Sequence, residues 1–294
     1  MLPPFNYFRP VTLNEALSFL ANEASRPAFI LAGGTDLILE MRSGRLPQDS
    51  FIVDISFLEE LRYLRTAKGN LEIGPLLSHG QISTSREILD FAPLLARACS
   101  EVGTPQVRAR GTIGGNVVHA SPAADSIPPL LLHDARVTLI SLRSERTVPL
   151  ISFLKDAYKS DLHEGELLWK ITLSPLQDFS FGYQRLIPRQ AVGIARLIVC
   201  VALKTKGQIE EACIAIGSAT PVAFRARKAE AFLKGKEASP DNLDFAASLA
   251  SEEMIEISGE RWSTPYKRPV LQALTKRALL EALSGSRGNG EGEN

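Results

Sequence analysis

Two glycine-rich segments contain the residues whose types and spacing could bind a phosphate. The first is Ala32-Gly33-Gly34-Thr35-Asp36, which begins at the last residue of the apolar run at residues 29–32. Successive glycines allow a tight turn that points several backbone N–H groups into one concavity, and such a concavity beside a helix N-terminus binds phosphate oxygens. Thr35 adds a hydroxyl donor. Taken alone, the segment also fits a strand–turn–helix corner in which the glycines serve only the geometry and Asp36 caps the helix.

The second segment is Gly111-Thr112-Ile113-Gly114-Gly115-Asn116, where glycines again flank a hydroxyl residue and Asn116 adds an amide. Arg108 and Arg110 precede it. The spacing matches neither the dinucleotide fingerprint of a Rossmann fold nor the phosphate loop with its Lys-Ser/Thr ending, so a Rossmann site is disfavoured. A glycine-rich turn without a ligand fits this segment as well as a binding loop does. Two such loops in one domain favour binding, because a pyrophosphate has enough oxygens to occupy both.

A third segment follows directly and consists of Ala120-Ser121-Pro122-Ala123-Ala124-Asp125. Pro122 stiffens the chain, and Asp125 precedes an apolar stretch that predicts a helix at residues 126–134. Asp125 therefore fits two roles. It can cap that helix, or its carboxylate can accept hydrogen bonds from a ribose or an adenine.

The composition is that of an ordinary globular protein. The chain has 294 residues, 45% of them hydrophobic and 22% charged, with a formal net charge of zero. This length favours two domains, and the balanced charge gives no support for nucleic acid or an anionic membrane as a partner. No signal peptide and no stretch as long as a membrane span is visible. Because Cys99, Cys200 and Cys213 are far apart and form no cluster with histidine, we expect no metal site in this chain and a reducing cytoplasm.

The elements that must position these segments are a mixture of strands and helices, which predicts an α+β protein. A capping sequence at residues 12–15 begins a first helix at Leu13. The patterns that follow predict strands at 29–32, 51–55, 71–73, 136–141 and 167–173, a helix at 91–102 and a loop at 103–115. A change in composition at 174–178 marks a domain boundary. Beyond it we expect a hairpin of residues 194–204 and 209–216, helices at 223–233, 241–257 and 266–283, and a disordered tail at 285–294.

Together these motifs resemble a known family. The two glycine segments, followed by Ser121-Pro122-Ala123-Ala124-Asp125, resemble the FAD-binding medium subunit of the xanthine dehydrogenase and carbon monoxide dehydrogenase family, the molybdenum hydroxylases. Residues 53–55 and 58–61 look like the next strand and loop of that family, and residues 181–189 like the segment that opens its C-terminal domain. The resemblance covers residues 1–283, and the double glycine loop with the motif that follows it is its specific part.

The resemblance implies a two-lobed FAD-binding domain of the vanillyl-alcohol-oxidase-like (PCMH) type at residues 1–177, with lobes at about 1–56 and 57–177. A smaller α+β domain of the carbon monoxide dehydrogenase flavoprotein type would follow at 178–284. FAD would lie between the lobes, with its pyrophosphate on both glycine loops. The residues that would contact FAD are Leu31, Ala32, Gly33, Gly34, Thr35, Asp36, Gly111, Thr112, Ile113, Gly114, Gly115, Asn116, Ala120, Asp125, Leu167, Gln184 and Arg185.

The resemblance also implies partners. In such systems a molybdopterin-binding large subunit oxidises the substrate, and a small subunit with two [2Fe–2S] clusters passes the electrons to FAD in the medium subunit. This chain would then be the electron-transfer flavoprotein of a cytoplasmic hetero-oligomer, such as a heterotrimer, without a catalytic residue or a metal of its own. Its FAD would reduce NAD, a quinone or oxygen. Relatives often carry an aspartate within the stretch that corresponds to residues 189–195, and this chain has none there.

Two other functions remain open at this stage. A self-contained flavoenzyme would have its own substrate pocket over the flavin and an acid or base near the ring, and residues 178–284 offer no obvious polar constellation for one. A non-catalytic nucleotide-binding module for assembly would keep the fold and lack flavin. Co-purification with two further subunits distinguishes the electron-transfer subunit from both alternatives.

Overall fold

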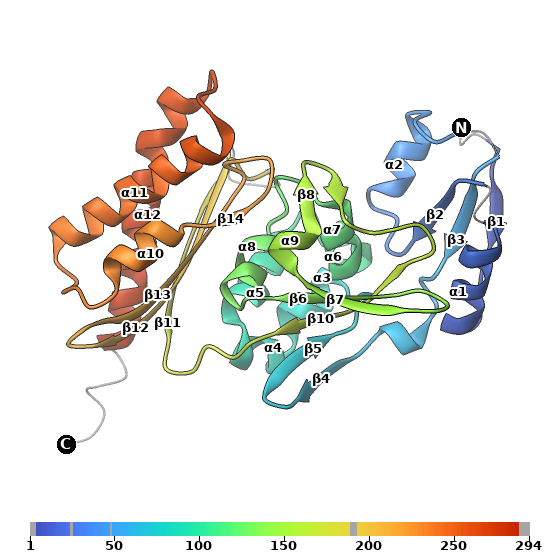
Figure 1. The fold of residues 1–294 in the computed structure, drawn as a ribbon, viewed down its shortest axis with the longest axis horizontal. Coiled ribbons are helices and arrows are strands. Elements are labelled where there is room, and N and C mark those ends of the chain that lie inside the picture. The colour runs from blue at the N-terminus through green and yellow to red at the C-terminus, as the bar shows by residue number, and fades with distance from the viewer. Residues whose placement is uncertain (1–3, 24–25, 48, 189–192, 288–294) are drawn as a thin grey trace.

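The computed structural model describes residues 4–23, 26–47, 49–188 and 193–287. The chain forms three parts that lie in a row (Figure 1), each built on one main β-sheet. We call them the first lobe (β1 to β3, blue), the second lobe (β4 to β10, cyan to yellow-green) and the C-terminal domain (β11 to α12, yellow to red). This order agrees with the predicted α+β architecture of a two-lobed domain followed by a smaller one.

The first lobe contains a three-stranded parallel sheet in the order β1-β3-β2. Parallel strands need crossover connections. Helix α1 connects β1 to β2, which lie on either side of β3, and α2 lies in the connection from β2 to its neighbour β3. As predicted, α1 begins after Thr12, whose hydroxyl accepts a hydrogen bond of 3.1 Å from the Glu15 N–H. The elements of this lobe are β1 (Asn6–Phe8), α1 (Leu13–Asn22), β2 (Ala28–Leu31), α2 (Leu37–Arg42) and β3 (Phe51–Asp54).

The second lobe is an antiparallel sheet in the order β4-β5-β10-β6-β7 with short helices packed on it. Strand β10 lies in the middle of this sheet, at the residues where the sequence predicts a strand. The elements are η1 (Glu59–Leu61), β4 (Leu64–Ala67), β5 (Asn70–Ile73), α3 (His79–Thr84), α4 (Arg86–Phe91), α5 (Pro93–Ser100), α6 (Pro105–Arg110), α7 (Ile113–His119), α8 (Ile127–Leu132), β6 (Arg136–Ile140), β7 (Glu145–Pro149), α9 (Leu150–Phe153), β8 (Leu154–Asp156), β9 (Lys159–Ser160) and β10 (Leu167–Leu173).

The C-terminal domain has an antiparallel sheet in the order β11-β12-β13-β14 and three helices on the face turned away from the second lobe (Figure 1). The predicted hairpin is the pair β12–β13, and an additional short strand, β14, precedes the first of the three helices. The elements are β11 (Ser180–Leu186), β12 (Leu197–Lys206), β13 (Gln208–Gly217), β14 (Phe224–Arg225), α10 (Arg227–Leu233), α11 (Pro240–Ser258) and α12 (Thr264–Arg287). No helix in the described ranges is long and apolar enough to cross a membrane.

Strand β12 is buried on both faces, because its alternating side chains enter two different hydrophobic cores. One core lies under helices α10 to α12, and the other extends through the second lobe. The side chains that face the helices are Leu197, Val199, Val201 and Leu203, and those that face the second lobe are Ile198, Cys200 and Ala202. A third core joins the two lobes and includes Val53 and Ile55 from the first with Leu76 and Leu167 from the second.

Three sequence-based expectations differ from the structure. The predicted helix at 91–102 is interrupted, because Pro93 has no N–H to continue α4 and instead begins α5. The predicted loop at 103–115 contains all of α6 and the start of α7, whose first turns are capped by Thr104 and Thr112. The predicted disordered tail is also wrong at its beginning, since α12 continues to Arg287; residues 288–294 lie outside the described residues.

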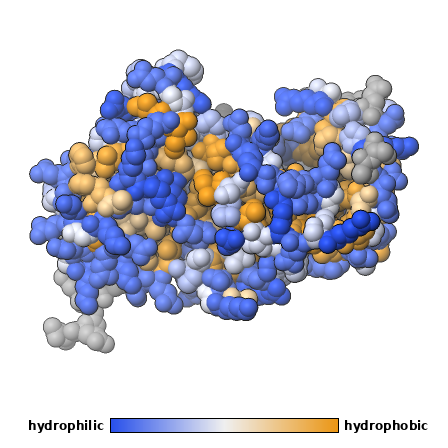
Figure 2. All heavy atoms as spheres, in the orientation of Figure 1, coloured by the Kyte–Doolittle hydropathy of each residue, from blue (hydrophilic) through white to orange (hydrophobic). Residues whose placement is uncertain are grey.

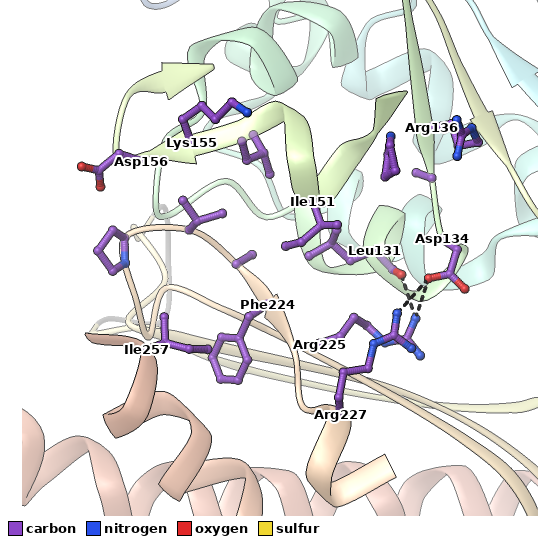
Figure 3. A pocket seen from close by; sticks show the side chains of 16 residues that line it. Leu131, Asp134, Arg136, Ile151, Lys155, Asp156, Phe224, Arg225, Arg227 and Ile257 are labelled. Atoms are coloured by element: carbon purple, nitrogen blue, oxygen red, sulfur yellow. Dashed lines mark hydrogen bonds and ion pairs between the residues drawn. The ribbon is translucent and has the colours of Figure 1, made fainter. Parts of the chain in front are cut away.

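A buried arginine connects the C-terminal domain to the second lobe. On the face shown in Figure 2, hydrophobic side chains are visible in the hollow between these two parts, where a cavity of about 770 Å³ lies (Figure 3). Arg225 lines this cavity and donates to the Leu131 carbonyl at 3.0 Å and to Asp134 at 3.2 Å. Its other partner is Glu230, and the side chains of that pair are 6% and 8% exposed.

We expect Arg225→Ala to reduce the free energy of unfolding by about 3–5 kcal/mol. The buried Glu230 carboxylate would keep only Arg227, whose side chain is 61% exposed, as its cation, and the bonds to Leu131 and Asp134 would be lost. The matched control is Arg86→Ala, which removes an ion pair to Asp90 whose side chains are 86% and 62% exposed. We expect that control to cost less than about 1 kcal/mol. Urea denaturation of both variants measures the difference, and equal losses would contradict the bridging role of Arg225.

Candidate cofactor site

The two glycine loops, which are far apart in the sequence, touch each other between the lobes. Gly33 packs directly on the backbone of the second lobe: a Cβ at this position would collide with the Arg110 carbonyl and lie 3.0 Å from the Gly111 Cα. In return, a Cβ on Gly111 would lie 3.4 Å from the Thr35 hydroxyl. The structure therefore brings together the two segments that the sequence singles out, and it does so by backbone contact that only glycine permits.

The first loop presents free hydrogen-bond donors. Gly34 has a φ of +75°, which turns the chain tightly before α2. Within the described part of the chain, the N–H groups of Gly33 to Asp36 have no acceptor, whereas the next bond of the helix runs from the Ile38 N–H to the Gly34 carbonyl at 3.2 Å. Asp36 stands at the N-cap of α2, but its side chain makes no capping bond. Consecutive unpaired N–H groups at such a turn are a binding site for an anion.

The second loop is built differently. Its N–H groups are already paired within the protein: Ile113 donates to the Leu77 carbonyl and Gly114 to the Pro75 carbonyl, each at 2.9 Å, and Gly115 donates to the Thr112 hydroxyl at 3.1 Å. Gly114 allows close contact, since a Cβ there would lie 2.7 Å from the Pro75 carbonyl oxygen. The glycines of this loop therefore serve close packing rather than a row of free donors.

Asn116 is the polar side chain that the second loop leaves available. Its carbonyl oxygen accepts a hydrogen bond of 2.6 Å from the Ser126 hydroxyl. No acceptor for its amide NH₂ is found among the described residues. The side chain is thus held in place from one side and can donate on the other.

Asp125 does not cap the following helix, because the N-cap of α8 is Ser126. Instead, its carboxylate accepts hydrogen bonds from Arg185 of β11, at 2.8 Å from Nε and 3.2 Å from Nη2. Burial raises the pKa of Asp125, and the hydrogen bond and charge of the Arg185 guanidinium oppose this rise. The same guanidinium donates to the Gly193 carbonyl at 3.0 Å. This pair fixes the C-terminal domain to the motif that follows the second glycine loop.

The remaining predicted contacts lie in two other places. Gln184 donates to Glu281 of α12 at 2.8 Å and, with Arg185, lines a second cavity of about 540 Å³. Leu167 is 2% exposed and its side chain belongs to the core between the lobes. None of the predicted contact residues lines the larger cavity of Figure 3. Of the stretch at 189–195 where relatives often carry an aspartate, residues 189–192 lie outside the described residues.

Sequence reasoning missed one neighbour of the loops, Tyr158. His119 lies with its Nε2 3.7 Å from the Asp36 carboxylate, and its ring centroid is 5.2 Å from that of Tyr158. Ala120, one of the predicted contacts, accepts a hydrogen bond of 2.9 Å from the Tyr158 N–H. Tyr158 belongs to the turn of a hairpin, β8–β9, that no pattern in the sequence predicts, so only the fold reveals it.

A buried histidine, His79, contacts the start of the second loop. The His79 N–H donates to the Gly111 carbonyl at 3.0 Å, and its ring nitrogen Nδ1 lies 3.4 Å from the Cys99 sulfur. Both side chains are buried, and burial lowers the pKa of His79 to about 4. The imidazole is therefore neutral in the folded protein at physiological pH.

Comparisons with known proteins agree with this arrangement. The sequence family described as "FAD binding domain in molybdopterin dehydrogenase" matches residues 3–175, and "CO dehydrogenase flavoprotein C-terminal domain" matches residues 183–282. The chain is 34% identical to the glyceraldehyde dehydrogenase medium chain of Sulfolobus acidocaldarius, over 96% of this chain and 99% of that one. It is 29% identical to the carbon monoxide dehydrogenase medium chain of Hydrogenophaga pseudoflava, over 96% and 98%.

Solved structures show the same similarity in three dimensions. A chain of quinoline 2-oxidoreductase from Pseudomonas putida 86 superposes with a TM-score of 0.88 at 27% identity, covering 97% of this chain and 99% of that one. A chain of the Hydrogenophaga pseudoflava carbon monoxide dehydrogenase gives 0.87 at 30% identity, with the same coverage. The protein belongs to the family of FAD-binding medium subunits of molybdenum hydroxylases, and it is the flavin subunit of an oxidoreductase. The free N–H groups at Gly33 to Asp36 fit the pyrophosphate of FAD.

We expect the stability of the protein to fall as the pH is lowered from about 6.5 to 4, in part because of His79. The unfolded chain binds a proton at His79 near pH 6.5, whereas the folded chain does so only near pH 4. Its contribution is therefore complete above pH 6.5 and decreases by up to about 1.4 kcal/mol per pH unit within this window. His79→Gln should flatten the dependence of the free energy of unfolding on pH.

The control for this measurement is His163→Gln, at a histidine whose side chain is 62% exposed. Urea denaturation at a series of pH values from about 7.5 down to about 5, which spans the unfolded pKa of 6.5, gives the slope for each variant. A wild-type slope that persists in His79→Gln and disappears in His163→Gln would contradict the assignment.

Proposed function

We propose that this chain transfers electrons within a molybdenum hydroxylase. It receives them from the [2Fe–2S] clusters of a small subunit, which in turn are reduced by a molybdopterin-binding large subunit, and its FAD passes them to NAD, a quinone or oxygen. The observation that carries the proposal is the row of free N–H groups in the first glycine loop, held against the second loop in a chain that matches its relatives over nearly its full length. Relatives with names such as "nicotine 6-hydroxylase medium subunit" support the assignment to a complex.

The residues of this chain would bind and orient the cofactor, while bound FAD supplies the redox chemistry. In this proposal the N–H groups of Gly33 to Asp36 bind the pyrophosphate, and the Thr35 hydroxyl donates beside them. The Asn116 amide donates from the opposite lobe. The Asp125–Arg185 pair keeps the motif at residues 121–125 in position, and Ala120 lies next to it. The other predicted contacts, including Leu31, Leu167 and Gln184, are retained as part of the same proposal.

We also propose the predicted domain boundaries. A boundary between the lobes at about residue 56 is supported by the end of β3 at Asp54 and the start of η1 at Glu59. A boundary at 177/178 is supported by the change of sheet between β10, which ends at Leu173, and β11, which begins at Ser180. A cytoplasmic location is supported by the free and buried state of Cys99, Cys200 and Cys213.

Gly33→Ala tests the cofactor site. We expect the new methyl group to push the two loops apart and to abolish FAD retention, because there is no space for it beside the Arg110 carbonyl. The matched control is Gly285→Ala in α12, where the new Cβ would lie at an ordinary contact distance of 3.9 Å from the Ser180 Cβ, and FAD retention should be unchanged. The visible absorption spectrum after desalting measures bound flavin. Equal flavin bands in the two variants would count against the site.

The complex itself gives a second test. Purified from its own host through a tag on this chain, the protein should bring down two further subunits, one with molybdopterin and one with [2Fe–2S] clusters. Substrate of the large subunit should then bleach the flavin band, because electrons reach FAD through the clusters. A protein that purifies alone, retains FAD and turns over a substrate would instead be a self-contained flavoenzyme.

A further inference from the structure

Tyr158 has a backbone conformation that tyrosine rarely adopts. Its φ is +59°, in the left-handed region, where glycine, asparagine and aspartate are the usual residues and a bulky side chain is an outlier. The residue stands in the turn between β8 and β9, a position for which glycine or asparagine would be the unstrained choice. A strained residue of this kind persists where the surrounding structure holds it, and such residues gather at binding sites.

The structure holds this turn firmly. The Tyr158 N–H donates to the carbonyl of Ala120, which is itself left-handed with a φ of +51°, so that two strained residues are joined by one hydrogen bond. On one side of the turn, the Ala157 N–H donates to the Asp156 carboxylate at 2.7 Å. On the other side, the Asp161 N–H donates to the Phe153 carbonyl at 2.8 Å. The direction of the Tyr158 side chain is thus set by a rigid frame.

The ring of Tyr158 is not part of any core. The residue is 65% exposed, and its hydroxyl has no hydrogen-bond partner in the described part of the chain. Its one aromatic neighbour among the described residues is His119, which meets it at an interplanar angle of 63°. Packing within the chain therefore does not explain why a tyrosine stands at a position that favours glycine.

The surroundings of the ring are those of the cofactor site. His119 connects Tyr158 to Asp36 of the first glycine loop, and Ala120 connects it to the end of α7, the helix that begins in the second loop. The pyrophosphate of FAD lies between the two planar ring systems of the cofactor. A pyrophosphate bound at the first loop therefore has one ring system on each side. Aromatic side chains stack on such rings whatever their substituents.

We propose that Tyr158 is a cofactor-binding residue whose exposed ring stacks against one of the two planar ring systems of FAD, and that the strained β8–β9 turn is retained to present it. This inference rests on the proposed function. The His119 ring, set at an angle to Tyr158, forms the second wall of the same corner. Tyr158 binds and orients the cofactor and takes no part in transferring a proton.

The test distinguishes the effect of the Tyr158 ring on FAD affinity from the effect of the left-handed turn on stability. Tyr158→Gly removes the ring and relieves the left-handed strain, so the variant should be at least as stable as the wild type while its dissociation constant for FAD rises roughly tenfold or more. Tyr158→Phe keeps the ring and should bind FAD within about twofold of the wild type. Tyr158→Asn, which tolerates the left-handed turn without supplying an aromatic ring, should behave as Tyr158→Gly does and provides a second variant if the glycine form folds poorly.

The matched control is Lys68→Gly, which relieves a left-handed residue (φ +52°) in the turn between β4 and β5 and should leave FAD affinity unchanged. The full chain, or the complex if the chain is obtained only with its partners, is freed of flavin and titrated with FAD by fluorescence quenching, and its melting temperature is measured by calorimetry. Titration with ADP identifies the ring: weaker ADP binding by Tyr158→Gly indicates stacking on adenine, and unchanged ADP binding indicates the isoalloxazine ring.

Either ADP result supports the proposal once FAD affinity falls in Tyr158→Gly and Tyr158→Asn and is kept in Tyr158→Phe. If the glycine and asparagine variants bind FAD as tightly as the wild type, the inference is overturned while the proposed function stands. If the wild-type protein itself takes up no FAD, both are overturned.

Discussion

The contact between Gly33 and the Arg110 carbonyl is the constraint on which the site depends. Two backbones from different lobes can approach this closely only where one of them carries no side chain. The lobes are held at that distance by a shared hydrophobic core, in which Val53 and Ile55 of the first lobe meet Leu76 and Leu167 of the second. Burial of Leu167 in this core therefore helps to hold the two glycine loops in contact.

The C-terminal domain is attached to the second lobe by its core and by charge. Residues 197–203 of strand β12 are buried on both faces, because one set of their side chains packs under the helices and the other packs on the second lobe. Two ion pairs then fix the orientation, Arg185 with Asp125 and Arg225 with Asp134. Asp125 ends the motif beside the second glycine loop. Its buried salt bridge with Arg185 therefore links the position of the C-terminal domain to that of this motif. Such a pair is a stronger determinant of geometry than of stability.

Features that depend on residues close together in the chain could be predicted from the sequence, and features that depend on distant residues could not. Strand β10 and the first helix are set by local patterns, a mostly apolar run and the Thr12 cap, and both were predicted. Helices α6 and α7 were missed because glycine and proline at 103–115 indicate a loop, although Thr104 and Thr112 are good capping residues. The role of Asp125 could not be settled, because its partner Arg185 lies far along the chain and capping was an equally good explanation. Tyr158 was missed for the same reason: nothing local marks a residue whose neighbours are His119 and Ala120.

The distribution of free donors indicates how the site works. Among the described residues, the second loop has used its N–H groups from Ile113 to Gly115 within the protein, and Gln184 and Asp125 are also paired. The donors left for a ligand are concentrated in the first loop and at Asn116. In the proposed site the pyrophosphate would thus be bound chiefly from the first lobe, and the second lobe would mainly close against it. In the proposed function the residues of this chain only bind and orient the flavin, and the redox chemistry is that of FAD. The proposed site fits that role, because its donors for the pyrophosphate are backbone N–H groups and the Asn116 amide.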